Sequence, residues 1–262
     1  MAAVAHYLTW LEAMRTEAAR LRHREVEPEH MLLGLLAQGG TAAAVLAAHG
    51  VTLARARAAV DDGRIGTPQL LRSLTRDPGP YGGDPASTPQ WTIFLETLIH
   101  DFDTLRWLNP GSEVVEVTAH ADALIRPDAR EAGFLDTAVV TLRFDNGAFA
   151  TAEASFSASY GYDVRGEVFG DGGMATAGST RTSDMDYYGP AGVSHDTARA
   201  DTELLHGAYV AEFVAFVDAI RSGADASAIP TGEDGVRSLE IARAAIISVS
   251  ESHTVSLEEV AR

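Results

Sequence analysis

The sequence contains neither cysteine nor lysine, and each absence excludes a class of chemistry. Without cysteine the chain can form no disulfide and offers no thiolate to a metal, which is compatible with a reducing compartment. All twenty of its Lys and Arg positions are arginine, so it supplies no Schiff base, phosphate-loop lysine or lysine proton donor. Lysine-dependent catalysis is therefore excluded for this chain.

Positive charge and long apolar runs are also scarce. Twenty arginines face 37 acidic residues, a net charge of -17 that repels nucleic acid and anionic membrane surfaces. No apolar run reaches the roughly 18 residues of a membrane helix, and the first 25 residues become charged too early for a secretory signal. We expect a cytoplasmic protein, and its 46% hydrophobic content over 262 residues is ample for a packed core.

Residues 1–60 differ in composition from the rest of the chain. They read as helices interrupted at Pro28, at the Gly39-Gly40 pair and at Gly50, and they carry 5 Glu against 6 Arg. The acidity of the protein therefore lies in residues 61–262. This difference predicts a domain boundary near residue 60.

Two motifs in this helical segment carry a resemblance. "VEPEHMLLGLL" (Val26 to Leu36) and "GGTAAAVLAAHGV" (Gly39 to Val51) are similar to the N-terminal repeat domain (Clp N) of the Clp unfoldase ATPases. The resemblance implies a module that recruits substrates or adaptors, although one repeat is found where that family usually has two. The histidines His30 and His49 are interpreted as packing or capping residues.

From Arg64 onward apolar and polar residues alternate with the period of a strand. The predicted strands are "PQLLRSLTRD", "SEVVEVTAHADAL", "LDTAVVTLRFDNGAFATAEASFSAS" and "YDVRGEVFG", and a short "TVSL" follows two predicted helices at 207–222 and 232–250. Strands in succession with helices around them indicate an α+β fold. We predict a large open antiparallel sheet with helices on one face, preceded by a small all-α helical module.

The stretch "FLETLIHDFDTLRWL" (Phe94 to Leu108) predicts a two-faced helix. At about 100° per residue one side carries Leu95, Leu98, Phe102 and Leu105. The opposite side carries Glu96, His100, Asp103 and Trp107. This pattern fits a solvated polar face, the commoner case, but a tryptophan rarely sits on a face made only for water. The polar side is therefore open to a functional interpretation.

The glycine-rich stretch "FGDGGMATAG" follows a hairpin and opens no helix. A dinucleotide-binding loop would instead join a strand to the N-terminus of a helix. We interpret the stretch as turn chemistry and expect no NAD(P) to be bound by this chain alone. No metal site is predicted either.

Four segments together resemble the C-terminal domain of the Gfo/Idh/MocA oxidoreductases, most closely the myo-inositol and related polyol dehydrogenases. They are "GRIGTPQLLRSLTRDP", "FLETLIHDFDTLRWL", "DTAVVTLRFDNGAFATAEASFSASYGYDVRGEVFG" and "PTGEDGVRSLEIARAA". The resemblance covers about residues 60–260. It implies an open antiparallel sheet that commonly forms an oligomer interface, a polyol or sugar substrate, and NAD(P) as the family's cofactor.

The same resemblance suggests site residues. The family's pair of a carboxylate and a histidine four residues apart falls on Glu96 and His100, which implies His100 as general base and Glu96 as the group that orients it. Asp77 in "TRDP" and Tyr160 in "YGYD" fall on substrate contacts, although a turn residue and a sheet aromatic are equally good interpretations. Asp101 and Asp103 are interpreted as helix-surface or supporting groups.

The family's Rossmann domain, with its glycine loop and catalytic lysine, has no counterpart in this sequence. Three hypotheses follow for the function of the chain. It is an oxidoreductase-family substrate domain, not active alone; or a non-catalytic adaptor that uses the Clp-type repeat; or a recombined gene fragment. The predicted partners are a small polyol, further copies of the chain through the sheet, and a protein partner of the repeat.

Overall fold

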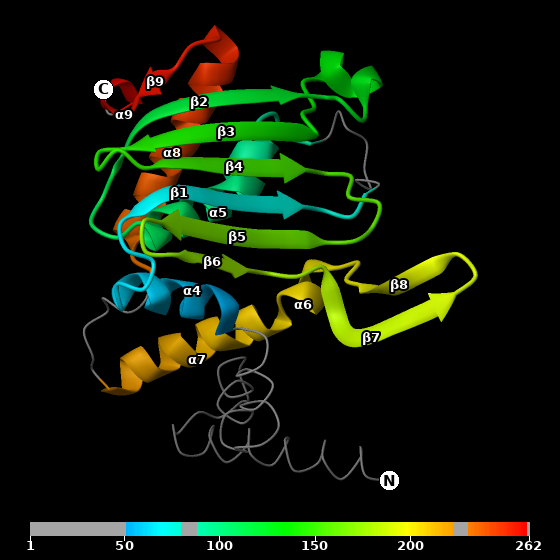
Figure 1. Ribbon diagram of the computed structural model, residues 1–262. Helices are drawn as coiled ribbons and strands as arrows, with labels where there is room; N and C mark the ends of the chain where they lie inside the picture. Colours follow the sequence, from blue (N-terminus) through cyan, green and yellow to red (C-terminus); the bar gives the residue numbers. More distant parts are fainter. Residues whose placement is uncertain (1–50, 80–87, 223–229, 261–262) are drawn as a thin grey trace, which may run out of the picture. The chain divides into compact units, whose positions relative to one another are not determined.

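The computed structural model describes residues 51–79, 88–222 and 230–260 (Figure 1). Its contacts divide the chain into two compact units, residues 1–51 with 206–229 and residues 52–205 with 230–262. Most of the predicted Clp-type segment, including Pro28, His30 and His49, lies outside the described residues. The boundary near residue 60 stays a prediction.

Seven strands of the described residues form one open sheet in the order β6-β5-β1-β4-β3-β2-β9. They are β1 (Pro68–Arg76), β2 (Val114–Asp122), β3 (Thr137–Phe144), β4 (Phe149–Ser155), β5 (Asp163–Gly170), β6 (Met174–Ala177) and β9 (Val255–Ser256). All neighbours are antiparallel except β1 and β4. A parallel pair needs a crossover connection, and this one carries helix α5 onto one face of the sheet.

One face of the sheet is buried by helices α5 (Leu98–Leu108) and α8 (Gly232–Glu251), which lie behind it in Figure 1. Strand β3 alternates strictly, with Ala138, Val140, Leu142 and Phe144 buried. The inward residues of β4 are alanines, which lets α5 approach the sheet closely. The predicted α+β fold, a mostly antiparallel sheet layered by helices, is confirmed.

The described residues form further elements. They are α4 (Val51–Asp61), the π-helical turn η2 (Ile93–Thr97), the 3-10 helix η3 (Pro127–Ala132), the hairpin β7 (Arg181–Gly189) and β8 (Gly192–Thr197), α6 (Asp201–Leu204), α7 (His206–Ser222) and α9 (Leu257–Val260). A capping box starts α8: the side chain of Thr231 accepts from the backbone N–H of Asp234, whose carboxylate accepts from the N–H of Thr231. These caps explain why α8 begins where the sequence predicts it.

The prediction of one continuous helix from Phe94 to Leu108 is wrong in one respect. Its first turn is the π-helical segment η2, and α5 starts only at Leu98. A π turn contains an extra residue, which rotates the preceding side chains relative to the following helix. Leu95, predicted on the buried side, is therefore 42% exposed, whereas Leu98, Phe102 and Leu105 are fully buried.

Candidate functional site

Glu96 and His100 lie on the outward side of the η2–α5 helix, opposite its buried leucines and Phe102. Glu96 belongs to the π turn and His100 to the first turn of α5, and both side chains are exposed. Both are open to a small molecule that approaches this side of the helix.

Asp77 follows β1 and continues the side of the strand that carries Ser73 and Thr75 toward α5. Burial raises the pKa of its carboxyl group, a hydrogen bond from Tyr162 opposes the rise, and the charges of Asp201 and Glu96 add to it. Its Oδ1 atom is buried without a hydrogen-bond partner among the described residues. Asp77 is thus a mostly buried carboxyl group held by Tyr162, and the charge of Glu96 has a minor influence on it.

Tyr160 belongs to a different group of side chains. Its hydroxyl donates to Asp163 Oδ2 at 2.7 Å and accepts from Arg76 Nη1 at 3.4 Å. Arg76 also pairs with Glu153 at 3.0 Å on the outward face of the sheet. The hydroxyl of Tyr160 is thus bound by an arginine and a carboxylate of the strands. These partners are Arg76 and Asp163, and not the predicted site residues Asp77, Glu96 and His100.

Tyr162 is the tyrosine of "YGYD" whose hydroxyl reaches Asp77, and the sequence reasoning missed it. Between the two tyrosines, Gly161 has φ +124°, and a Cβ there would lie 2.4 Å from Thr197 Oγ1. The turn at Gly161 directs the two rings to different partners.

Asp101 is buried, so the helix-surface interpretation is wrong for this residue, and its other interpretation, as a supporting group, stays a prediction. Its side chain is 2% exposed and accepts from Ser73 Oγ at 2.5 Å and from Thr75 Oγ1 at 2.9 Å. Burial raises the pKa of Asp101 to about 7, the two hydroxyls oppose the rise, and the charge of Asp77 adds to it. Asp103, by contrast, is 40% exposed beside Arg106.

Trp107 has a specific neighbour on the polar side of the helix. The guanidinium of Arg57, on α4, lies 5.5 Å from the centre of its ring and donates to its backbone carbonyl. A cation over an indole face is an attractive arrangement that leaves the ring partly solvated, here 42% exposed. The packing against α4 thus explains why the Trp107 ring lies on the polar side of the helix, and no ligand is needed to account for it.

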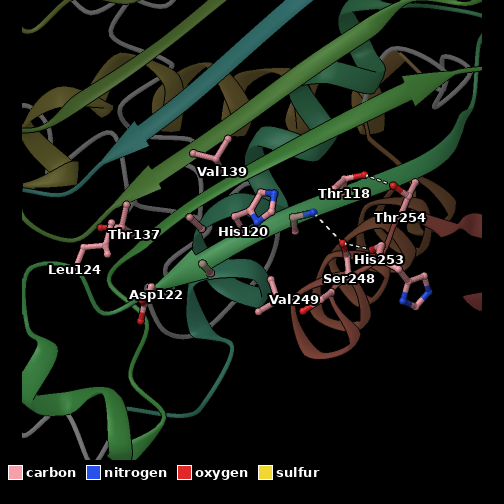
Figure 2. Close-up of a pocket in the computed structure, with 14 residues that line it drawn as sticks. Thr118, His120, Asp122, Leu124, Thr137, Val139, Ser248, Val249, His253 and Thr254 are labelled. Atoms are coloured by element: carbon pink, nitrogen blue, oxygen red, sulfur yellow. Dashed lines mark hydrogen bonds between the residues drawn. The ribbon is translucent and has the colours of Figure 1, made fainter.

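A cavity of about 600 Å³ lies elsewhere, between β2, β3 and the end of α8 (Figure 2). Several of its hydroxyls are already hydrogen-bonded: Thr118 to Thr254 at 2.8 Å, and Ser248 to the carbonyl of His253 at 2.6 Å. None of the four predicted site residues lines it. The candidate site is therefore the exposed α5 face, with Asp77 at its side.

The glycine-rich stretch does not fit a dinucleotide. The glycine-rich stretch is the turn between β5 and β6, as predicted, and it packs against the loop before β1. A Cβ on Gly170 would lie 2.4 Å from the carbonyl oxygen of Ile65, so this turn is already filled by protein. A pyrophosphate cradle needs open backbone N–H groups at a helix N-terminus, which this turn does not offer.

No group of three or more His, Cys, Asp and Glu residues in the described ranges could hold a metal ion. No helix in the same ranges is long and apolar enough to cross a membrane.

Comparison with known proteins assigns the sheet to a family. Residues 53–176 match the family model of the GFO/IDH/MocA C-terminal domain. Through these residues the chain belongs to the Gfo/Idh/MocA family. Residues 9–91 match the Clp repeat N-terminal domain, so the two matches overlap where α4 and β1 lie.

Individual relatives of this Gfo/Idh/MocA chain are oxidoreductases. An uncharacterized oxidoreductase of Bacillus subtilis is 38% identical over 83% of this chain and 66% of its own length. Myo-inositol 2-dehydrogenase of Thermotoga maritima is 38% identical over 77% of this chain and 60% of its own. The chain thus spans less than two thirds of these relatives.

A solved structure gives the same result for the fold. Scyllo-inositol dehydrogenase from Lactobacillus casei, crystallised with NAD(H) and scyllo-inositol, superimposes with a TM-score of 0.74 at 26% identity. The match covers 79% of this chain and 62% of that one. The inositol dehydrogenase-like character of the sheet domain is thereby established.

Proposed function

We propose that this domain binds an inositol or a related polyol on the exposed face of η2 and α5. The observation that carries the proposal is that Glu96 and His100 share the outward side of one helix, and the charge of Glu96 also acts on the carboxyl group of Asp77. Groups exposed on the same side of a helix can contact adjacent hydroxyls of a polyol ring. The family membership of the chain supports this choice of ligand.

Each group has a role in the proposed site. The imidazole of His100, when neutral, accepts the proton of a bound hydroxyl, and the carboxylate of Glu96 orients the imidazole or the hydroxyl. Asp77, with its raised pKa and its free Oδ1, hydrogen-bonds a neighbouring hydroxyl while Tyr162 holds its other oxygen. Tyr160 stays a proposed substrate contact that would have to exchange Asp163 for the ligand.

The redox half of the family's reaction uses NAD(P). Because the described residues form no dinucleotide cradle, we assign no step of hydride transfer to them. We propose that the chain supplies substrate binding and proton acceptance, and that dehydrogenase activity requires a nucleotide-binding domain in addition to it. A protein partner for the Clp-type segment stays a prediction.

The proposed site predicts that both side chains are needed for inositol binding. In calorimetric titrations with myo-inositol, His100→Ala and Glu96→Ala each lose about 1–3 kcal/mol of binding free energy, since the substrate hydroxyl and the remaining group are left unpaired. His120→Ala and Glu116→Ala, on the outward side of β2, serve as matched controls and keep the wild-type affinity. Equal affinity in the wild type and both site variants would rule out this face.

We also propose that copies of the chain associate through the outward face of the sheet. Neighbouring strands present a row of large apolar side chains there, each 40–58% exposed: Phe149, Leu70, Phe169 and Met174. A contiguous apolar row of this kind is typical of an interface between subunits.

Self-association can be tested by sedimentation velocity over a wide range of concentrations. We expect wild-type oligomers and a shift to monomer in Phe149→Glu, because a charge in the row would be buried without a partner. Leu124→Glu, at a residue 63% exposed in a loop, is the control and leaves the oligomer intact. A wild type that is monomeric throughout would contradict the proposal.

A further inference from the structure

The rotation of α5 about its axis is not set by the hydrogen bonds of the helix itself. The π turn η2 precedes α5, and its i→i+5 hydrogen bonds interrupt the regular α-helical ladder at this point. The rotation of α5 about its axis determines whether the side chain of His100 points outward. Contacts outside the helix must therefore fix this rotation. Phe102 and Leu105 bury apolar area against the sheet, but apolar contacts have little directional preference.

Asp101 makes the directional contacts. It follows His100 directly, so the two side chains leave the helix about 100° apart. Its two oxygens accept from Ser73 and Thr75, which lie two residues apart on the same side of β1. Two attachment points on one strand fix both the rotation of the helix and its position along the strand.

We propose that Asp101 is a positioning residue for the polyol site: its buried carboxyl group, bound to two hydroxyls of β1, sets the rotation of the η2–α5 helix that presents Glu96 and His100. The inference rests on the proposed function for its consequence, but its geometry can be tested without a ligand. The carboxyl group touches no substrate and acts only through the helix that carries it.

The test compares Asp101→Ala with the conservative Asp101→Asn in the full chain. Asparagine can still bridge Ser73 and Thr75, whereas alanine removes both contacts. The NMR signals of the His100 ring and the Glu96 side chain report their surroundings directly. We expect these signals to shift or broaden in Asp101→Ala and to return to wild-type positions in Asp101→Asn.

Two further variants keep the test decisive. Thr75→Val removes one of the two anchors at nearly constant volume, and we expect a smaller displacement of the same signals even if Asp101→Ala fails to fold. Glu116→Ala, on the outward side of β2, should leave them unchanged. Wild-type His100 and Glu96 signals in Thr75→Val and in a folded Asp101→Ala would overturn the proposal.

Myo-inositol affinity gives a second readout. Asp101→Ala should bind at least about tenfold more weakly, because misplacing a contact group by an ångström can cost about a hundredfold in related processes, and Asp101→Asn should restore binding. If the wild type binds no inositol, the proposed function fails, and the NMR signals alone decide the role of Asp101. If inositol binds but Asp101→Ala binds it as the wild type does, the positioning role fails while the site stands.

Discussion

The wild-type chain is expected to lose stability as the pH rises from about 4 to about 7, and Asp101→Asn is expected to remove this loss. The pKa of Asp101 is raised from 3.8 to about 7 by burial, so the folded state favours the protonated acid. An acid whose pKa is higher in the folded state than in the unfolded state contributes its full stability below the unfolded-state pKa. This contribution is lost as the pH rises through the folded-state pKa. The difference corresponds to about 4 kcal/mol between pH 4 and pH 8 as an upper value.

Two other carboxyl groups act in a different pH range. The pKa values of Asp128 and Asp234 are lowered, by the hydrogen bond from Arg126 and by the backbone N–H of Thr231, so their contributions fade only as the pH falls below the usual range. Burial raises the pKa of Asp77 as well, and its charge acts on Asp101. Subtracting the profile of Asp101→Asn from that of the wild type therefore reports Asp101 together with its coupling to Asp77. The asparagine amide reproduces the shape and the donor of the neutral acid.

The measurement is urea unfolding at several pH values between 4 and 8, followed by circular dichroism. The matched control is Asp103→Asn, two residues further along α5 with an exposed carboxylate, which should follow the wild-type profile. Relative to the wild type, Asp101→Asn should gain stability steadily toward pH 8. Parallel profiles for the wild type and Asp101→Asn would contradict the assignment of a buried neutral acid.

The second large effect is expected for Asp136→Ala. The carboxylate of Asp136 is 1% exposed and accepts from the backbone N–H groups of Leu124, Ile125 and Arg126 at 2.8–3.0 Å. It also accepts from the hydroxyl of Thr137 at 2.8 Å. One side chain thus satisfies three backbone donors in the turn that follows β2.

Removing this carboxylate leaves those donors without their acceptor. Each buried unsatisfied donor costs about 1–3 kcal/mol, and water can replace part of the loss because Leu124 and Ile125 are exposed, so we expect a decrease of about 3–5 kcal/mol in the free energy of unfolding. Asp128→Ala, in the adjoining η3, removes a carboxylate that pairs with the exposed side chain of Arg126 and should cost much less. Similar losses in the two variants would show that Asp136 does not organise the turn.

The strands of the sheet could be predicted from the sequence because their alternation is complete. In β3 and β4, buried and more exposed residues follow each other without a break, and the Asn146-Gly147 turn between them allows φ +89° at the glycine. Helix α8 could be predicted because the capping residues Thr231 and Asp234 mark its start. In these elements local chemistry and tertiary packing agree.

The candidate site was predicted only in part, because its geometry depends on contacts between distant segments. The burial of Asp101 follows from Ser73 and Thr75 on another element, and the sequence of the helix alone places it among polar residues. A signal existed in β1, where Ser73, Thr75 and Asp77 occupy alternate inward positions of a central strand and require polar partners. The π turn and the divergence of Tyr160 and Tyr162 had no comparable signal.

The central claim, that the face bearing Glu96 and His100 is a polyol site, is tested most directly by mapping myo-inositol onto the full chain. A titration followed by backbone and side-chain NMR signals would show which residues sense the ligand. The account predicts saturable shifts concentrated at Glu96, His100, Asp77 and Tyr162. Shifts concentrated instead around the cavity at Thr118 and Ser248, or no saturable shifts at millimolar inositol, would contradict it.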